Sequence, residues 1–109
     1  MFKKLSLELG GKNPNIIFAD CDFDEMLSTT LRSSFANQGQ ICLCGSRIFV
    51  EEAIYERFRD AFVARVSKTT VSYPEDPKAI LGAVVSEAHM KKVLSYVELA
   101  KEEGNNYVV

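Results

Sequence analysis

Residues 15–35 read NIIFADCDFDEMLSTTLRSSF and predict a strand followed directly by a helix. The apolar, β-branched run at 15–19 is typical of a strand buried in a parallel sheet. Asp20 or Asp22 can cap the helix, because an aspartate oxygen accepts the free backbone N–H groups at a helix start. The apolar face of this helix repeats every four residues, at Phe23, Leu27, Leu31 and Phe35. We expect the helix to end near Gly39.

A second strand and helix follow on the C-terminal side. Residues 46–52, SRIFVEE, alternate between polar and apolar side chains, which predicts a strand. The next helix has its apolar face at Ile54, Phe58, Phe62 and Val66. Residues 70–85 contain two prolines and predict mainly a loop.

Further elements are expected towards both ends of the chain. Residues 4–9, KLSLEL, have the period of two that indicates a short strand, and the turn residues 10–14 follow it. Ser86 can cap a third helix, and Gly104 can end it. The apolar face of that helix is formed by Met90, Val93, Leu94 and Val97. Residues 105–109 resemble the beginning of another strand.

Helices that alternate with apolar strands predict an α/β fold with layered packing. The 109 residues suffice for one small domain. A strand is expected almost at the first residue, and another is unfinished at the last one. We therefore expect both ends to be truncated and the chain to be part of a larger α/β protein.

The charge and the hydropathy pattern exclude several functional classes. The net charge is −2, without a basic block, so nothing attracts a nucleic acid backbone. No apolar run approaches the ~20 residues that span a bilayer, and the N-terminus lacks the apolar segment of a signal peptide. Three cysteines form no disulfide framework. We therefore expect a cytoplasmic protein with neither a membrane nor a nucleic acid as partner.

Residues 36–47, ANQGQICLCGSR, hold two of the three cysteines in C-x-C spacing. A structural zinc site needs four cysteine or histidine ligands, usually in pairs separated by two to four residues. Besides Cys42 and Cys44, the chain offers only Cys21 and His89, so we expect no metal. A free cysteine is most often a small buried apolar side chain, and by spacing alone either cysteine of the pair fits that description, as Cys21 does.

Cys42 differs from an ordinary cysteine in its neighbours. It follows the polar, turn-forming residues 37–40 and precedes an expected strand, so its thiol can face a cleft with free N–H groups for an oxyanion. A reactive thiolate needs a base. His89 is expected to be a partly exposed surface residue of the third helix, so it is not the base. The base would then have to be a carboxylate. Glu8 is the candidate, because two glycines follow it; the alternative is an ordinary charge at a strand end.

Two sequence motifs of this chain resemble signatures of a known enzyme family. Residues 7–18, LELGGKNPNIIF, resemble the glutamate signature of the aldehyde dehydrogenase superfamily, and residues 35–47 resemble its cysteine signature. Glu8 and Cys42 stand 42 − 8 = 34 residues apart, and this separation also matches the family. The resemblance extends along the whole chain, and residues 33–50 look most like the 2-aminomuconic semialdehyde dehydrogenases. It implies that residues 1–109 are a partial catalytic domain without the NAD-binding domain or the oligomerisation segment.

The resemblance also implies residue roles. Cys42 matches the nucleophile, which attacks an aldehyde and passes through a thiohemiacetal and a thioester, whereas Cys44 matches a non-catalytic position. Glu8 matches the general base. Leu9 and Gly10 match a segment beside the nicotinamide ring of NAD⁺ or NADP⁺. The substrate would be a small aldehyde, such as 2-aminomuconic semialdehyde, and the full-length enzyme would be a homo-oligomer.

The chain also departs from the family pattern. It lacks the oxyanion-hole asparagine, the adenine- and phosphate-binding residues and the downstream glutamate that holds the nicotinamide ribose. Residues 10–12, GGK, do not have the spacing of a phosphate-binding loop. Most of the cofactor site therefore lies outside this chain, and we expect the chain alone to be inactive. The alternative is a non-catalytic truncated paralogue or interaction fragment, which would expose apolar surface at an unfinished sheet.

Overall fold

The computed structural model describes residues 2–106, which form a βαβ unit followed by two more helices. Its elements are β1 (Pro14–Ile17), α1 (Phe23–Phe35), the 3₁₀ turn η1 (Ala36–Gly39), β2 (Arg47–Val50), the 3₁₀ turn η2 (Glu52–Ile54), α2 (Tyr55–Val66) and α3 (Glu87–Glu102). The expected α/β order is confirmed for these elements. Residues 67–86 form the expected loop, which contains one isolated bridge between Val71 and Leu81.

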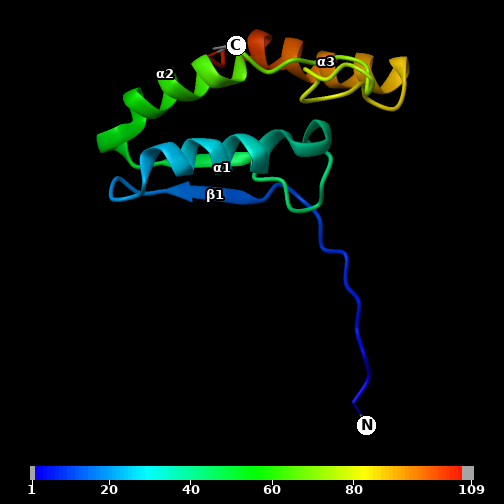
Figure 1. Ribbon diagram of the computed structural model, residues 1–109, viewed down its shortest axis with the longest axis horizontal. Helices are drawn as coiled ribbons and strands as arrows, with labels where there is room; N and C mark the ends of the chain where they lie inside the picture. Colours follow the sequence, from blue (N-terminus) through cyan, green and yellow to red (C-terminus); the bar gives the residue numbers. More distant parts are fainter. Residues whose placement is uncertain (1, 107–109) are drawn as a thin grey trace.

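The two strands pair in parallel, with Pro14 opposite Arg47 and Ile17 opposite Val50. Helices α1 and α2 lie on the same side of this sheet (Figure 1). The other side carries Ile16 and Phe49, which are 61% and 52% exposed. The expectation of a strand buried on both faces is therefore wrong for the chain as it stands, because both helices cover the same face.

A small core lies between this sheet and the two helices. Its buried hydrophobic cluster takes one residue from each of three elements: Ile17 of β1, Leu27 of α1 and Phe58 of α2. The ring of Phe62 stacks on Phe58 with centroids 5.1 Å apart, and on Phe35 at 6.2 Å. The predicted four-residue spacing of α1 and α2 is what brings these side chains to one interface.

The structure has the helix caps that the sequence predicts for α1 and α3. The Asp22 carboxylate accepts the N–H of Glu25 at 3.0 Å, which selects Asp22 over Asp20 as the cap of α1. Ser86 caps α3 by accepting the N–H of His89 at 3.2 Å. Gly104 follows α3 with φ +79°, a left-handed conformation that glycine adopts without a Cβ penalty.

Residues 4–9 do not form the expected strand. They have no regular secondary structure and run away from the helices (Figure 1). A strand requires a hydrogen-bonded neighbour, and the only named sheet within residues 2–106 consists of β1 and β2. Leu5, Leu7 and Leu9 are consequently all exposed. Of the strand expected at 105–109, residues 107–109 lie outside the described part.

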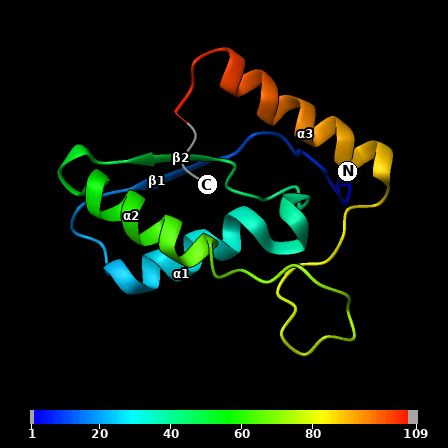
Figure 2. The same cartoon turned by 90° about the horizontal axis from the view of Figure 1, so that it is seen from above.

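Helix α3 keeps its predicted length but not its predicted burial. It lies apart from the β1–β2 sheet (Figure 2) and has no buried residue. Of the expected apolar face, Met90, Val93 and Leu94 are between 44% and 51% exposed. An apolar stripe becomes buried only where another element packs on it, and within residues 2–106 none does so here. None of the described helices is long and apolar enough to cross a bilayer.

The chain exposes more surface than a self-contained domain of its size. Its accessible area is 8998 Å² for 12.2 kDa, whereas a compact monomer of that mass has roughly 6,100 Å². Its radius of gyration is 16.5 Å, against about 13 Å for a compact domain of this length. The fold therefore leaves apolar faces uncovered, on the sheet and on α3.

Candidate active site

The turn between α1 and β2 brings the C-x-C residues to the N-terminal end of β2. Three consecutive residues of this turn, Asn37, Gln38 and Gly39, have positive φ angles of 50°, 56° and 72°. Left-handed conformations are costly for asparagine and glutamine, so they persist only where surrounding contacts hold them. The helix is thereby stopped within one turn, and the chain reverses just before Cys42.

Helix α1 anchors the end of the C-x-C segment at Gly45. The Gly45 N–H donates to the carbonyl and the hydroxyl of Ser33, both at 3.2 Å, and the Ser34 hydroxyl donates to the Gly45 carbonyl at 3.1 Å. A Cβ at position 45 would stand 2.8 Å from the Ser33 Oγ and 3.1 Å from the Asn15 Cβ. Only glycine permits this close approach of the loop to α1 and β1.

Asn13 anchors the same segment from the other side. Its side-chain amide donates to the carbonyl of Cys42 at 2.6 Å and to that of Cys44 at 3.2 Å. Sequence reasoning missed this residue, because an asparagine before a proline reads as turn chemistry. No local pattern could reveal contacts that span 29 and 31 residues.

The structure brings together Glu8, Gly10 and Cys42. The Glu8 carboxylate accepts the N–H of Gly10 at 2.9 Å. A Cβ at Gly10 would lie 2.8 Å from the Glu8 Oε1 and 3.4 Å from the Cys42 Cβ, so carboxylate and thiol side chain flank the same glycine. Both Glu8 and Cys42 are exposed. A thiol and a carboxylate that are 34 residues apart in sequence therefore share one open site.

The Glu8 carboxylate changes the acidity of the Cys42 thiol. A hydrogen bond to Glu8 raises the pKa of Cys42 above its ordinary value, partial desolvation and the negative charge of Glu8 add to this, and the backbone N–H groups of Cys42 and Leu43 oppose it. In this conformation the raised pKa favours the protonated thiol beside the carboxylate. Such a pair suits general-base activation, in which the proton moves as the sulfur attacks.

The other cysteines and the histidine lie away from this pair. Cys44 is buried, and its thiol donates to the carbonyl of Ala36 at 3.9 Å, so it behaves as the small core side chain described above. Cys21 is half-buried beside the core, and His89 is half-buried on α3. Among residues 2–106, no group of three or more His, Cys, Asp and Glu side chains could hold a metal ion.

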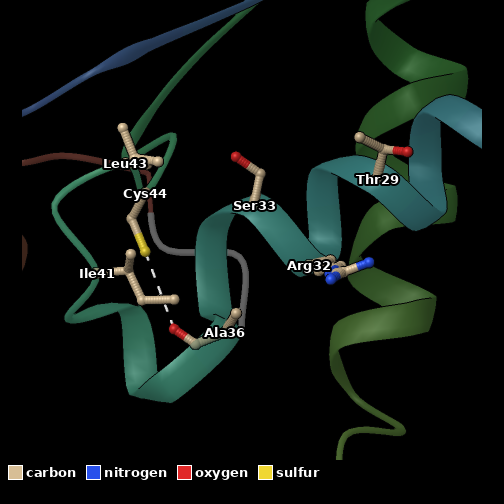
Figure 3. Close-up of a pocket in the computed structure, with 7 residues that line it drawn as sticks. All are labelled: Thr29, Arg32, Ser33, Ala36, Ile41, Leu43 and Cys44. Atoms are coloured by element: carbon tan, nitrogen blue, oxygen red, sulfur yellow. Dashed lines mark hydrogen bonds between the residues drawn. The ribbon is translucent and has the colours of Figure 1, made fainter.

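An open pocket of about 430 Å³ lies between α1 and the C-x-C segment (Figure 3). It is mainly apolar, and Cys42 does not line it. The lining residues are Thr29, Arg32, Ser33, Ala36, Ile41, Leu43 and Cys44. The buried Cys44 thiol points from this wall towards Ala36 (Figure 3). This pocket is therefore separate from the Glu8–Cys42 pair.

Leu9 and Gly10 directly follow Glu8 in the chain. Leu9 is 80% exposed, and the missing Cβ of Gly10 leaves room for the Glu8 carboxylate and the Cys42 side chain to lie on either side of the glycine.

The βαβ unit and its paired thiol and carboxylate define an α/β protein with a cysteine-centred site. The profile of the aldehyde dehydrogenase family matches residues 1–109, and the chain belongs to this family. Its fold is therefore a partial aldehyde dehydrogenase α/β fold, as the signature motifs indicate.

Several relatives have semialdehyde dehydrogenase names. Human 2-aminomuconic semialdehyde dehydrogenase is 58% identical over 94% of this chain, and 2-aminomuconic 6-semialdehyde dehydrogenase of a Pseudomonas species is 45% identical over 97%. The NAD⁺ complex of betaine aldehyde dehydrogenase from Staphylococcus aureus superposes with a TM-score of 0.89 at 41% identity over 94% of this chain. The chain spans only about a fifth of these proteins, 21%, 22% and 20% respectively.

Proposed function

We propose that this chain supplies the nucleophile and the general base for the oxidation of an aldehyde to a carboxylic acid. The observation that carries the proposal is the Glu8 carboxylate at the Cys42 thiol, with both residues against Gly10. Membership in the aldehyde dehydrogenase family supports the same reaction.

In the first half of the reaction, the Cys42 sulfur attacks the carbonyl carbon while its proton passes to the Glu8 carboxylate. The product is a tetrahedral thiohemiacetal, and the backbone N–H of Cys42 stabilises its oxyanion. NAD⁺ or NADP⁺ would supply the hydride acceptor for that carbon, and Leu9 and Gly10 would contact its nicotinamide ring. Loss of the hydride leaves a thioester on Cys42.

In the second half, water attacks the thioester. Once Glu8 has released the first proton to solvent, it takes a proton from this water, the C–S bond breaks and the carboxylic acid leaves. The proton on Glu8 then returns to the Cys42 sulfur, which restores the thiol and the carboxylate. The open surroundings of Glu8 and Gly10 give the water access to this site. The same carboxylate therefore acts in both halves.

The substrate class follows from the relatives. Several of them are named for muconic semialdehydes, including 2-hydroxymuconic semialdehyde dehydrogenases of Pseudomonas at 42% identity. We infer that the substrate is a small aldehyde, in particular a semialdehyde such as 2-aminomuconic semialdehyde. The longer enzyme would act as a cytoplasmic homo-oligomer.

The coupling of Glu8 to Cys42 is testable by alkylation. At pH 7.5 we expect iodoacetamide to modify Cys42 faster than Cys21 and Cys44, because Cys42 is the exposed cysteine among the three. Glu8→Gln should accelerate the alkylation of Cys42 further, because it removes the carboxylate whose hydrogen bond and negative charge raise the pKa of this thiol. Peptide mass spectrometry measures the three rates, and a Cys42 rate unaffected by Glu8→Gln would contradict the proposed pair.

The isolated chain is expected to have no dehydrogenase turnover. It carries at most the nicotinamide contact at Leu9 and Gly10, so NAD⁺ has too few partners to bind tightly. Saturating NAD⁺ should leave the midpoint of a far-UV circular dichroism melt unchanged, whereas a ligand at 100 times its Kd adds about 2.7 kcal/mol. A raised midpoint, or NADH formation with an aldehyde, would contradict this expectation.

The exposed apolar faces favour one second candidate, a non-catalytic interaction fragment. Ile16, Phe18 and Phe49 are between 52% and 63% exposed on or beside the open face of the sheet. A fragment of this kind needs no coupled thiol. If Cys42 is alkylated at the same rate in the unmodified chain and in the Glu8→Gln variant, the interaction fragment is favoured over the enzyme.

A further inference from the structure

Asn13 connects the two segments that carry the proposed base and nucleophile. Its side-chain amide donates to the carbonyls of Cys42 (2.6 Å) and Cys44 (3.2 Å), so the two N–H bonds of one NH₂ group have two acceptors. Its own carbonyl accepts the N–H of Arg47 at 3.1 Å, one residue before β1 begins. The segment that leads from Glu8 into β1 is thus tied to both ends of the tripeptide 42–44.

These bonds fix the peptide groups around the thiol. The Cys42 carbonyl belongs to the same planar peptide as the Leu43 N–H, so holding this carbonyl also sets the direction of that N–H. The backbone N–H groups of Cys42 and Leu43 both lower the pKa of the Cys42 thiol. Rotation of the 42–43 peptide would therefore remove a donor from the sulfur and from any oxyanion formed next to it.

We propose that Asn13 is a positioning residue for the chemistry of Cys42, because its amide clamps the carbonyls of Cys42 and Cys44 and thereby holds the thiol and its N–H donors in register with Glu8. This inference rests on the proposed function. Asparagine suits the task because its short side chain ends in an NH₂ group with two donors, whereas serine has one donor and aspartate would turn acceptors towards two carbonyl oxygens.

The test compares variants of the 109-residue chain in a Glu8→Gln background. Glu8 raises the pKa of the Cys42 thiol, whereas the backbone N–H groups lower it. Once the Glu8 carboxylate is removed, a further change in this pKa reports on the N–H groups. In that background Asn13→Ala should slow Cys42 alkylation by iodoacetamide about threefold or more, the effect of losing one hydrogen bond. The pH profile of the rate should also move to higher pH, because fewer N–H groups stabilise the thiolate.

Asn15→Ala is the matched control. Asn15 lies two residues further along and donates to the Thr30 hydroxyl at 3.3 Å, not to the C-x-C carbonyls. Its removal should leave the Cys42 pH profile in place. Asn13 has no specific positioning role if Asn13→Ala and Asn15→Ala both keep the pH profile of Cys42 alkylation seen in the Glu8→Gln parent. The same holds if the two variants shift this profile equally.

A measurement on the unmodified chain covers the case in which Asn13→Ala does not fold. Nuclear Overhauser contacts should connect the Asn13 side-chain NH₂ protons with residues 42–44, and these protons should exchange with solvent about tenfold or more slowly than a free amide. Rapid exchange without such contacts would overturn the clamp. The proposed function fails separately, through a Cys42 rate that does not respond to Glu8→Gln.

Discussion

A thioester on Cys42 is expected to hydrolyse about a hundredfold more slowly when Glu8 is replaced by glutamine, at the lower end of what a general base contributes. The Glu8 carboxylate accepts the Gly10 N–H at 2.9 Å and stands at the Cys42 side chain, so water attacking the acylated sulfur can lose its proton to it. Glutamine has a similar shape but cannot take up that proton.

The measurement needs no cofactor. An activated ester such as p-nitrophenyl acetate transfers its acetyl group to the exposed Cys42, which gives the same kind of thioester that hydride loss would leave. Intact-mass spectrometry then follows the loss of the acetyl group with time. Glu52→Gln, at the opposite end of β2, serves as the control and should hydrolyse like the unmodified chain. Equal rates for all three proteins would remove Glu8 from the second half of the reaction.

Leu27→Ala is expected to cost about 2–5 kcal/mol of the free energy of unfolding, the range for deleting a buried leucine side chain. Leu27 is 2% exposed and contacts the core between the sheet and α2. A domain of this length has a total stability of roughly 5–15 kcal/mol, and a chain with so few buried side chains belongs at the low end. The substitution should therefore abolish or strongly weaken the cooperative unfolding transition.

Urea unfolding followed by far-UV circular dichroism measures this loss. Leu94→Ala is the matched control, because Leu94 also lies within a helix but is 51% exposed. It should shift the urea midpoint far less than Leu27→Ala. If the two substitutions have equal effects, the Ile17–Leu27–Phe58 cluster is not the core that holds β1, α1 and α2 together.

Local patterns explain why much of the fold could be predicted. The caps at Asp22 and Ser86 and the stop at Gly104 depend on side chains within a few residues of the backbone groups that they serve. The strand at 4–9 shows the limit of such patterns. Its alternation of side chains is correct for a strand, but a strand also needs a partner, and residues 2–106 do not provide one.

The sequence by itself determined the family, the order of the elements and the identity of the candidate pair, because signature residues and periodicity are properties of the chain alone. Only the tertiary structure decided how the pair is arranged. It placed Glu8 against the Cys42 thiol with a pKa raised in that conformation, buried Cys44 instead of Cys42, and tied the C-x-C carbonyls to Asn13. The Glu8–Cys42 pair and the Asn13 contacts join residues about thirty positions apart, so they exist only once the chain has folded and β1 has paired with β2.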